Sequence, residues 1–192
     1  MTLRDLILKN RSYRRFHQDH VIDRITLEEL VELARLTPSA ANKQPLRYIL
    51  SCEGTKNRAI FPALGWASYL KEWPGPDEGE RPSAYIVICT DTSIDEKVIW
   101  GDHSIAAMAI LLGAAERGLG GCMIGNIKKE NLSSALEIPE RYSPLLVVAL
   151  GKPKEEVIID EVKEEEGIRY FRDEKGNHHV PKRSLDDIIL KI

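Results

Sequence analysis

The chain has 192 residues, 43% of them hydrophobic and 30% charged, which is typical of one globular domain with a substantial core. The formal net charge of -3 provides no general attraction for nucleic acid or anionic membranes, so we expect neither as a partner. Three scattered cysteines and five histidines show neither a disulfide framework nor zinc-site spacing. With no apolar run long enough to cross a bilayer and no signal peptide at the charged N-terminus, the expected location is the cytoplasm.

Two helices are predicted near the N-terminus. Residues 2–9 begin with Thr2 and Asp5 at the spacing of a capping box. A second helix is expected to begin at Thr26, with Glu29 completing another capping box, and to end at the next proline. Apolar residues recur at helical spacing in both segments, so each helix should present one face to the core.

Two buried strands are predicted at Leu46–Cys52 and Ala84–Thr90, because both segments are rich in β-forming apolar residues. The intervening residues 53–83 begin with helical character and end in a Pro/Gly/acid stretch that regular structure does not accommodate. We interpret this segment as a surface flap. Its aromatic residues either shield the core, which we favour, or stack on a substrate: Trp66, Tyr69 and Trp73.

A strongly apolar helix is predicted after Asp102, which we expect to act as its N-cap. Residues 105–115 show no polar face, and a helix that is apolar all round must be buried on every side. A subunit interface is therefore expected to cover the side that one small domain leaves open. The glycines of residues 118–121 are expected to end this helix in a sharp turn.

The C-terminal part is predicted to add one polar helix, one buried strand and a loosely organised tail. The helix is expected at about residues 129–136, and the strand at Pro144–Leu150, stopped by Gly151–Pro153. The acidic residues 155–166, which include an edge strand at 157–162, are expected to face solvent, and the histidines are expected to be exposed to solvent or to act as caps. The tail 167–192 lacks a core of its own and is expected to pack on a neighbour. This mixed order of strands and helices favours an α+β fold over a doubly wound one.

Two polar segments together could hold an anion at one end and a polar ring system at the other. Arg11–Phe16 concentrates cations and a hydroxyl, and Pro38–Pro45 offers a hydroxyl and two amides in a loop bounded by prolines. There is no GxxxxGK[ST] phosphate loop, and Gly118–Gly121 follows a helix instead of a strand, unlike a dinucleotide fingerprint. Ser39 lacks a GxSxG context. Because no acid, base or nucleophile stands out, the pattern is typical of a protein that positions a reactive cofactor.

Several segments, in this order along nearly the whole chain, resemble the nitroreductase family of flavin-dependent oxidoreductases. They are Arg11–Phe16, Pro38–Pro45, Trp100–Asp102 leading into the alanine-rich helix, Gly118–Gly125, Gly151–Pro153 and Lys182–Arg183. The resemblance implies an α+β fold with a central, mostly antiparallel sheet flanked by helices. It also implies that residues 1–192 form one FMN-binding domain in an intertwined homodimer, with the C-terminal tail packed on the partner.

The same resemblance implies FMN at the dimer interface and NADH or NADPH as the electron donor. The FMN phosphate would face Arg11 and Arg183 together with Lys182, and Ser12 would bond the phosphate or the ribityl chain. Arg14 would lie near the N1/O2 edge of the ring, where a cation favours the reduced flavin.

The ring itself would be enclosed from two sides. The partner subunit would supply Pro38, Ser39 and Ala40, while Asn42 and, more weakly, Gln44 would approach the ring or ribityl chain. Ile124 and Gly125 would line the other side, near N5. Two positions depart from the family pattern: Asn10, where many members carry a second arginine, and Leu46, where many carry tryptophan.

The function that this resemblance implies is the ping-pong transfer of hydride from NAD(P)H through FMN to a small electron-poor acceptor, such as a nitroaromatic or a quinone. Two alternatives remain open. One is a narrower reductive reaction, such as dehalogenation of an aromatic substrate, with the flap as the discriminating segment. The other is a flavin-binding protein without physiological turnover, which the departures at Asn10 and Leu46 slightly favour.

Overall fold

The computed structural model describes residues 1–94, 101–162, 167–190 and 192. The described helices are α1 (Leu3–Lys9), α2 (Arg24–Arg35), α3 (Gly54–Ile60), α4 (Asp102–Glu116), α5 (Lys129–Ala135) and α6 (Leu185–Ile188), with short 3-10 turns η1 (Ala40–Asn42) and η2 (Phe61–Ala63). The described strands are β1 (Phe16–His17), β2 (Leu46–Ser51), β3 (Ala84–Asp91), β4 (Gly120–Ile124), β5 (Tyr142–Pro153), β6 (Val157–Val162), β7 (Phe171–Arg172) and β8 (His178–Arg183).

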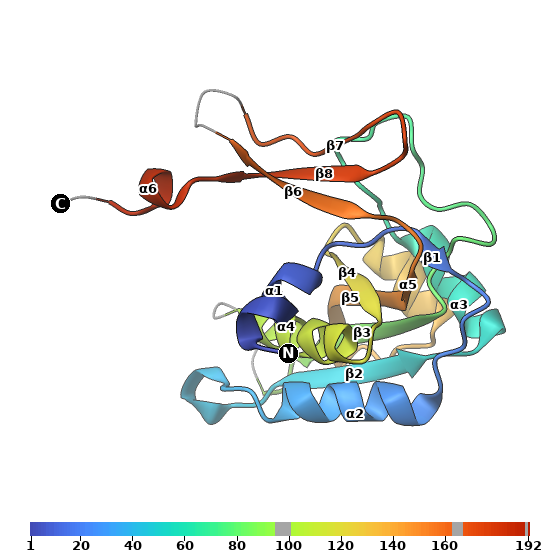
Figure 1. Ribbon diagram of the computed structural model, residues 1–192. Helices are drawn as coiled ribbons and strands as arrows, with labels where there is room; N and C mark the ends of the chain where they lie inside the picture. The colour runs from blue at the N-terminus through green and yellow to red at the C-terminus, as the bar shows by residue number, and fades with distance from the viewer. Residues whose placement is uncertain (95–100, 163–166, 191) are drawn as a thin grey trace.

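A central antiparallel sheet forms the middle layer of the molecule. Its order is β1-β5-β3-β2, with β4 also paired to β5, and all of these pairings are antiparallel. Helices lie on either side of this sheet (Figure 1). The expected α+β architecture with a mostly antiparallel sheet and flanking helices is therefore confirmed.

Strand β3 is buried along its whole length because helices cover both of its faces. Ile86 and Ile88 belong to a core cluster with α2 and α4, whereas Tyr85 and Val87 belong to a second cluster with α3 and α5. Alternate residues of a strand point to opposite faces of the sheet. The unbroken apolar run of β3 therefore contributes side chains to both core clusters.

The predicted start of the second helix is wrong by a few residues. Helix α2 begins at Arg24, and its N-cap is Asp23, whose carboxylate accepts a hydrogen bond from the Thr26 backbone nitrogen at 2.8 Å. Aspartate is among the most effective N-caps, so the helix begins directly after Asp23 and Thr26 lies inside it. The capping box predicted for α1 is confirmed, since Thr2 and Asp5 exchange both hydrogen bonds.

Two predictions about the glycine-rich segments are also wrong. Gly120 and Gly121 lie in strand β4 and not in a turn, and β5 continues to Pro153 instead of stopping before Gly151. A Cβ on Gly121 would lie 2.4 Å from the Ala149 carbonyl oxygen, so this glycine is required by close packing on β5. The turn itself uses Gly118, whose φ of +70° is strained for other residues.

Helix α4 is preceded by Gly101, which is its N-cap, so the predicted capping role of Asp102 is wrong. Asp102 is instead the first residue of the helix, and Trp100 lies outside the described residues. One side of α4 packs into the core, but Ile105 is 43% exposed. The single chain thus leaves part of this apolar helix uncovered, as the sequence predicts for a helix at a subunit interface.

The C-terminal residues form a second, three-stranded sheet in the order β6-β8-β7, with β6 and β8 parallel. We call residues 157–162 and 167–190 the C-terminal arm, which extends beyond the body of the molecule and carries α6 near its tip (Figure 1). The predicted edge strand is therefore real, but it pairs within the arm. No helix in the described ranges has the length and apolarity needed to cross a bilayer.

Candidate functional site

One surface cleft brings together three of the residues singled out from the sequence: Arg14, Ile124 and Gly125. Its volume is about 180 Å³, and its wall is completed by Gly65–Ser68 of the flap, residues of β4 and Tyr170 of the C-terminal arm. A cation thus faces the end of a strand whose residues are small or apolar.

Arg14 is fixed at this cleft by contacts from two directions. Its Nη1 donates to the Ser12 carbonyl oxygen at 3.2 Å and lies 3.2 Å from His178 Nε2. Its guanidinium carbon lies 5.0 Å from the centre of the Tyr170 ring, a cation–π contact. The position of this cation therefore depends on the C-terminal arm as well as on the N-terminal segment.

The buried carboxylate of Glu155 holds the backbone beside Arg14. Its Oε1 accepts hydrogen bonds from the backbone nitrogens of Arg14 at 2.5 Å and Arg15 at 3.1 Å, and its Oε2 pairs with Arg172 at 3.2 Å. The Glu155 side chain is 0% exposed. A charge that is fully buried requires such partners, because desolvation otherwise costs several kcal/mol.

His178 is neutral at physiological pH. Burial lowers its pKa to about 4, and the nearby cations Arg14 and Arg172 add to this effect. A neutral imidazole can accept a hydrogen bond from an arginine, so His178 Nε2 is suited to receive the Arg14 Nη1 donor. Its Nδ1 is buried and has no hydrogen-bond partner in the described part of the chain.

The residues that precede Arg14 lie beside β4. Ser12 forms a parallel bridge with Gly121, and the Tyr13 backbone nitrogen donates to the Gly121 carbonyl at 3.0 Å. Arg11 Nη2 donates to the Ile7 carbonyl at 2.6 Å, whereas its Nε is buried without a partner among the described residues. One arginine donor is therefore still available for a further acceptor.

The proline-bounded loop lines a different cavity of about 400 Å³, which includes Pro38, Ser39 and Gln44. Asp102 anchors the loop: its Oδ2 accepts from Ser39 Oγ at 2.6 Å, and its carboxylate also accepts from the Ala40 backbone nitrogen. Asp102, the first residue of α4, therefore fixes the loop instead of capping the helix.

Several residues of the same loop have an unusual backbone. Ala41, Asn42 and Gln44 have φ values of 49°, 52° and 50°, in the left-handed region that non-glycine residues rarely adopt. Gln44 Nε2 donates to Asn42 Oδ1 at 3.1 Å, so the two amides contact each other. Such strain persists only where surrounding contacts enforce it, and it clusters at functional sites.

Within one chain, the structure does not bring all the predicted site residues together. The cleft at Arg14 and the cavity at Ser39 share no lining residue. Lys182 and Arg183 are exposed at the end of β8, paired with β6, and line neither space.

The flap divides its aromatic residues between the core and the cleft. Trp66 is buried and lines the cleft, and Trp73 is half-buried with Arg172 4.3 Å above its ring centre. Tyr69 is 48% exposed and packs on Tyr170, with 4.8 Å between the ring centres. The predicted core-shielding role therefore describes Trp66 and Trp73 better than Tyr69.

Sequence reasoning missed Glu155, Tyr170 and His178. Glu155 belongs to an acidic run expected to face solvent, and His178 to a group of histidines expected to be exposed or to act as caps. Both residues are buried, and His178 lies in strand β8, so both expectations are wrong. Nothing local in the sequence marks them, because their burial depends on the arm reaching back to Arg14. No group of three or more candidate metal ligands occurs among the described residues.

Comparison with known proteins identifies the family. The nitroreductase family profile matches residues 7–152, so the chain belongs to the nitroreductase family. A protein of Archaeoglobus fulgidus, provisionally named NADH dehydrogenase/NAD(P)H nitroreductase, is 30% identical over 79% of this chain and 85% of its own length. The Bacillus subtilis protein provisionally named NAD(P)H nitroreductase YodC is 37% identical, covering 77% of this chain and 88% of the relative.

A solved structure supports the same assignment. The FMN-dependent nitroreductase of Clostridium difficile R20291 superposes with a TM-score of 0.63 and is 27% identical, covering 79% of this chain and 87% of the other. The chain thus has the nitroreductase fold and has NAD(P)H nitroreductase relatives. The family match ends at residue 152, so the C-terminal arm lies beyond it.

Proposed function

We propose that this protein is an FMN-dependent NAD(P)H oxidoreductase that reduces nitroaromatics, quinones or similar electron-poor acceptors by a ping-pong hydride transfer. The observation that carries the proposal is the fixed cation of Arg14 in one cleft with Ile124 and Gly125. These are the residue types expected beside a flavin ring: a cation at its N1/O2 edge and small or apolar residues near N5. The FMN-dependent relative from Clostridium difficile supports the choice of cofactor.

The residues present fit FMN. The buried, unpartnered Nε of Arg11 is an available donor for a phosphate, and Ser12 lies next to it in the chain. Gly125 leaves the cleft open, since a Cβ there would have only Leu146 at 3.9 Å as a neighbour. Arg11 and Ser12 would therefore hold the phosphate or ribityl end, and Arg14 would lie at the ring.

The complete site would need two copies of the chain. The Ser39 loop and the Arg14 cleft are separate within one chain, whereas in a homodimer the loop of one subunit could meet the cleft of the other. Pro38, Ser39 and Ala40 would then come from the partner, with Asn42 and Gln44 beside the ring or ribityl chain. Lys182 and Arg183, carried on the arm, would add cations near the phosphate.

When bound, FMN would supply the hydride chemistry, and the chain would position it. Arg14 would favour the reduced, more negatively charged form of the ring, because a fixed cation stabilises nearby negative charge. The neutral His178 and the ring of Tyr170 would keep that guanidinium in place. Trp66 and the rest of the cleft wall would restrict access of water and select the acceptor.

The direct test is to purify the protein, record its visible spectrum, and add NADH or NADPH without oxygen. We expect a yellow protein, or one that takes up added FMN, whose visible flavin absorbance is bleached by at least one nicotinamide and restored by a nitroaromatic or quinone. A colourless protein that fails to take up FMN would refute the proposal. Bound FMN that neither nicotinamide reduces would instead indicate a flavin-binding protein without turnover.

A further inference from the structure

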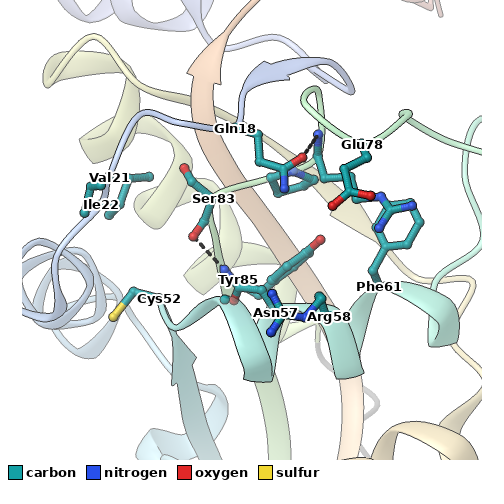
Figure 2. A pocket seen from close by; sticks show the side chains of 13 residues that line it. Gln18, Val21, Ile22, Cys52, Asn57, Arg58, Phe61, Glu78, Ser83 and Tyr85 are labelled. Atoms are coloured by element: carbon teal, nitrogen blue, oxygen red, sulfur yellow. Dashed lines mark hydrogen bonds between the residues drawn. The ribbon is translucent and has the colours of Figure 1, made fainter.

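A third cavity lies between α3 and the segments at residues 18–22 and 78–83, away from the spaces described above (Figure 2). Its volume is about 170 Å³, and none of its lining residues lines the Arg14 cleft or the Ser39 cavity. Both polar and apolar side chains line it, as Figure 2 shows. The proposed oxidoreductase function uses no part of it.

Arg81 is one of two arginines that line this cavity. Its guanidinium carbon lies 4.3 Å from the centre of the Phe61 ring, and its backbone nitrogen donates to Gln18 Oε1 at 3.1 Å. Its Nε is buried without a hydrogen-bond partner, and the guanidinium forms no ion pair, among the described residues. A positioned guanidinium whose planar donors remain available is well suited to a carboxylate.

Ser83 offers a second donor beside Arg81. Its hydroxyl is buried and has no hydrogen-bond partner in the described chain, whereas its carbonyl accepts from Asn57 Nδ2 at 2.7 Å. Asn57 Oδ1 in turn accepts from Ser51 Oγ at 2.7 Å, so these hydrogen bonds connect Ser83 through Asn57 to strand β2. The backbone here is therefore fixed, and the hydroxyl is left available for a ligand.

Apolar side chains complete the lining and limit the size of what can enter. They are Phe61 beside Arg81, together with Ile22, Pro82 and the half-buried Cys52, and Val21 is exposed at the rim. A protein cavity of about 150 Å³ is known to hold one benzene molecule. A cavity of about 170 Å³ thus accommodates one ring or an aliphatic chain of similar volume.

The charges of the lining favour a monoanion. Arg58 and Arg81 are opposed by Glu78, which leaves one net positive charge. A dianion such as a phosphate ester carries two negative charges against this one positive charge. A neutral ring would provide no negative charge to pair with the Arg81 guanidinium.

We propose that this cavity is a second ligand site, which binds a small monocarboxylate with one apolar ring or an equivalent chain. The carboxylate pairs with the Arg81 guanidinium and accepts from the Ser83 hydroxyl, and the apolar part packs between Phe61, Pro82 and Ile22. The site requires neither flavin nor turnover, so it stands or falls independently of the proposed oxidoreductase function.

Titration of the purified full-length protein with benzoate, followed by calorimetry, tests the proposal. Benzoate should bind, the isosteric neutral benzamide should bind at least about tenfold more weakly, and Arg81→Gln should weaken benzoate binding at least about tenfold. The matched control Arg4→Gln, an exposed arginine of α1, should bind benzoate as the wild type does. Equal affinity of benzoate for wild type and Arg81→Gln would place the binding elsewhere and overturn the proposal, as would equal affinity for benzoate and benzamide.

Alkylation of Cys52 locates the ligand without relying on Arg81 variants. Cys52 lines the cavity and is half-buried, whereas Cys89 and Cys122 are buried. Saturating benzoate should slow iodoacetamide labelling of Cys52 several-fold, measured by peptide mass spectrometry, and an unchanged rate would contradict the proposal. If Arg81→Gln fails to fold, Ser83→Leu, which fills the cavity and keeps Arg81, should abolish the same protection.

Discussion

Among single residues, Glu155 has a structural role that its place in an acidic segment does not predict. It stands in an acidic run, yet its carboxylate is fully buried and joins the backbone before β1 to Arg172. Arg14 belongs to the same network through His178 and Tyr170. One cation of the candidate site and its backbone are thus held by groups more than 140 residues away, and the Glu155 side chain among them is 0% exposed.

Replacing Glu155 should destabilise the protein, because the two backbone N–H groups and Arg172 would lose their charged acceptor. We expect Glu155→Ala to lower the free energy of unfolding by about 3–5 kcal/mol, and Glu155→Gln, which keeps one acceptor oxygen, by about 1–3 kcal/mol. Urea denaturation measures both values. The adjacent Glu156 is exposed, so Glu156→Gln should change stability by less than about 0.5 kcal/mol. Equal effects at positions 155 and 156 would contradict this role.

Arg11 and Arg14 should differ in what they do to the flavin. Arg11→Ala should mainly weaken FMN affinity, since its buried Nε is the available phosphate donor. Arg14→Ala should in addition lower the midpoint potential of bound FMN, because it removes the cation from the cleft. Fluorescence titration gives the affinity, and spectroelectrochemistry gives the potential. If both variants lose affinity with the potential unchanged, the division between phosphate and ring is wrong.

At the scale of elements, the sequence was informative wherever burial follows a local pattern. The apolar run of β3 and the capping box of α1 are predicted correctly because periodicity and side-chain chemistry decide them within a few residues. The glycines of β4 predict a turn instead of a strand, because the contacts that require them form only in the folded sheet: Gly121 packs on the Ala149 carbonyl oxygen, and Gly120 packs on Tyr13 and Pro153. The sequence predicts too short a strand β5 for the same reason, since Gly151 pairs with β4 and Pro153 pairs with β1 only in the folded sheet.

The candidate site shows the same division. Arg14, Ile124 and Gly125 could be selected by resemblance to a family and do share a cleft. Asp102 could not be assigned to the Ser39 loop from sequence, because 63 residues separate the two bonded side chains. Tyr170 and His178 cannot be assigned to the site from sequence. Their positions depend on how the C-terminal arm packs against the Arg14 segment, and no local sequence motif predicts that packing.

The flap is attached to the body by a charged contact that should make stability depend on pH. Glu80 pairs with Arg15 at 2.5 and 2.7 Å and with Lys154 at 3.0 Å, and its side chain is 16% exposed. The Arg15 hydrogen bonds lower the Glu80 pKa to about 2, from an ordinary value of 4.5. A lowered folded-state pKa gives stability that is fully present above 4.5 and is lost as pH falls toward 2.

Comparison of the wild type with Glu80→Gln measures this contribution. At pH 7 the variant should be less stable by about 1–3 kcal/mol, and the difference should shrink by roughly half or more at pH 3. Urea denaturation at the two pH values provides the numbers. Glu28→Gln is the control, because Glu28 forms an exposed pair with Arg24 and its side chain is 55% exposed. A Glu80→Gln deficit that stays constant with pH would show that packing, not charge, attaches the flap.

Considered as a whole, the described part of the single chain leaves apolar side chains of the arm, α1 and α4 uncovered. Helix α6 exposes Leu185 by 69% and Ile188 by 61%, and α1 and α4 add further apolar residues, such as Leu3 at 65% and Ile105 at 43%. Soluble monomers rarely expose extended apolar patches of this kind. An arm that projects beyond the body and ends in apolar residues is the form expected of a segment that packs on a second copy (Figure 1).

If the arm joins two copies, a charge placed on its apolar tip should separate them. Ile188→Asp would bury a carboxylate in an apolar contact, a cost of several kcal/mol that weakens self-association, so sedimentation velocity should show a dimer in the wild type and mainly monomer in the variant. FMN should then bind at least about tenfold more weakly, because loss of the second copy removes the Ser39 loop and the arm cations from the site. Ile25→Asp, at a 66% exposed isoleucine of α2, is the matched control and should leave both properties unchanged. A dimer that persists in Ile188→Asp would place the interface elsewhere, and a monomeric variant that retains full FMN affinity would show that one chain holds the cofactor alone.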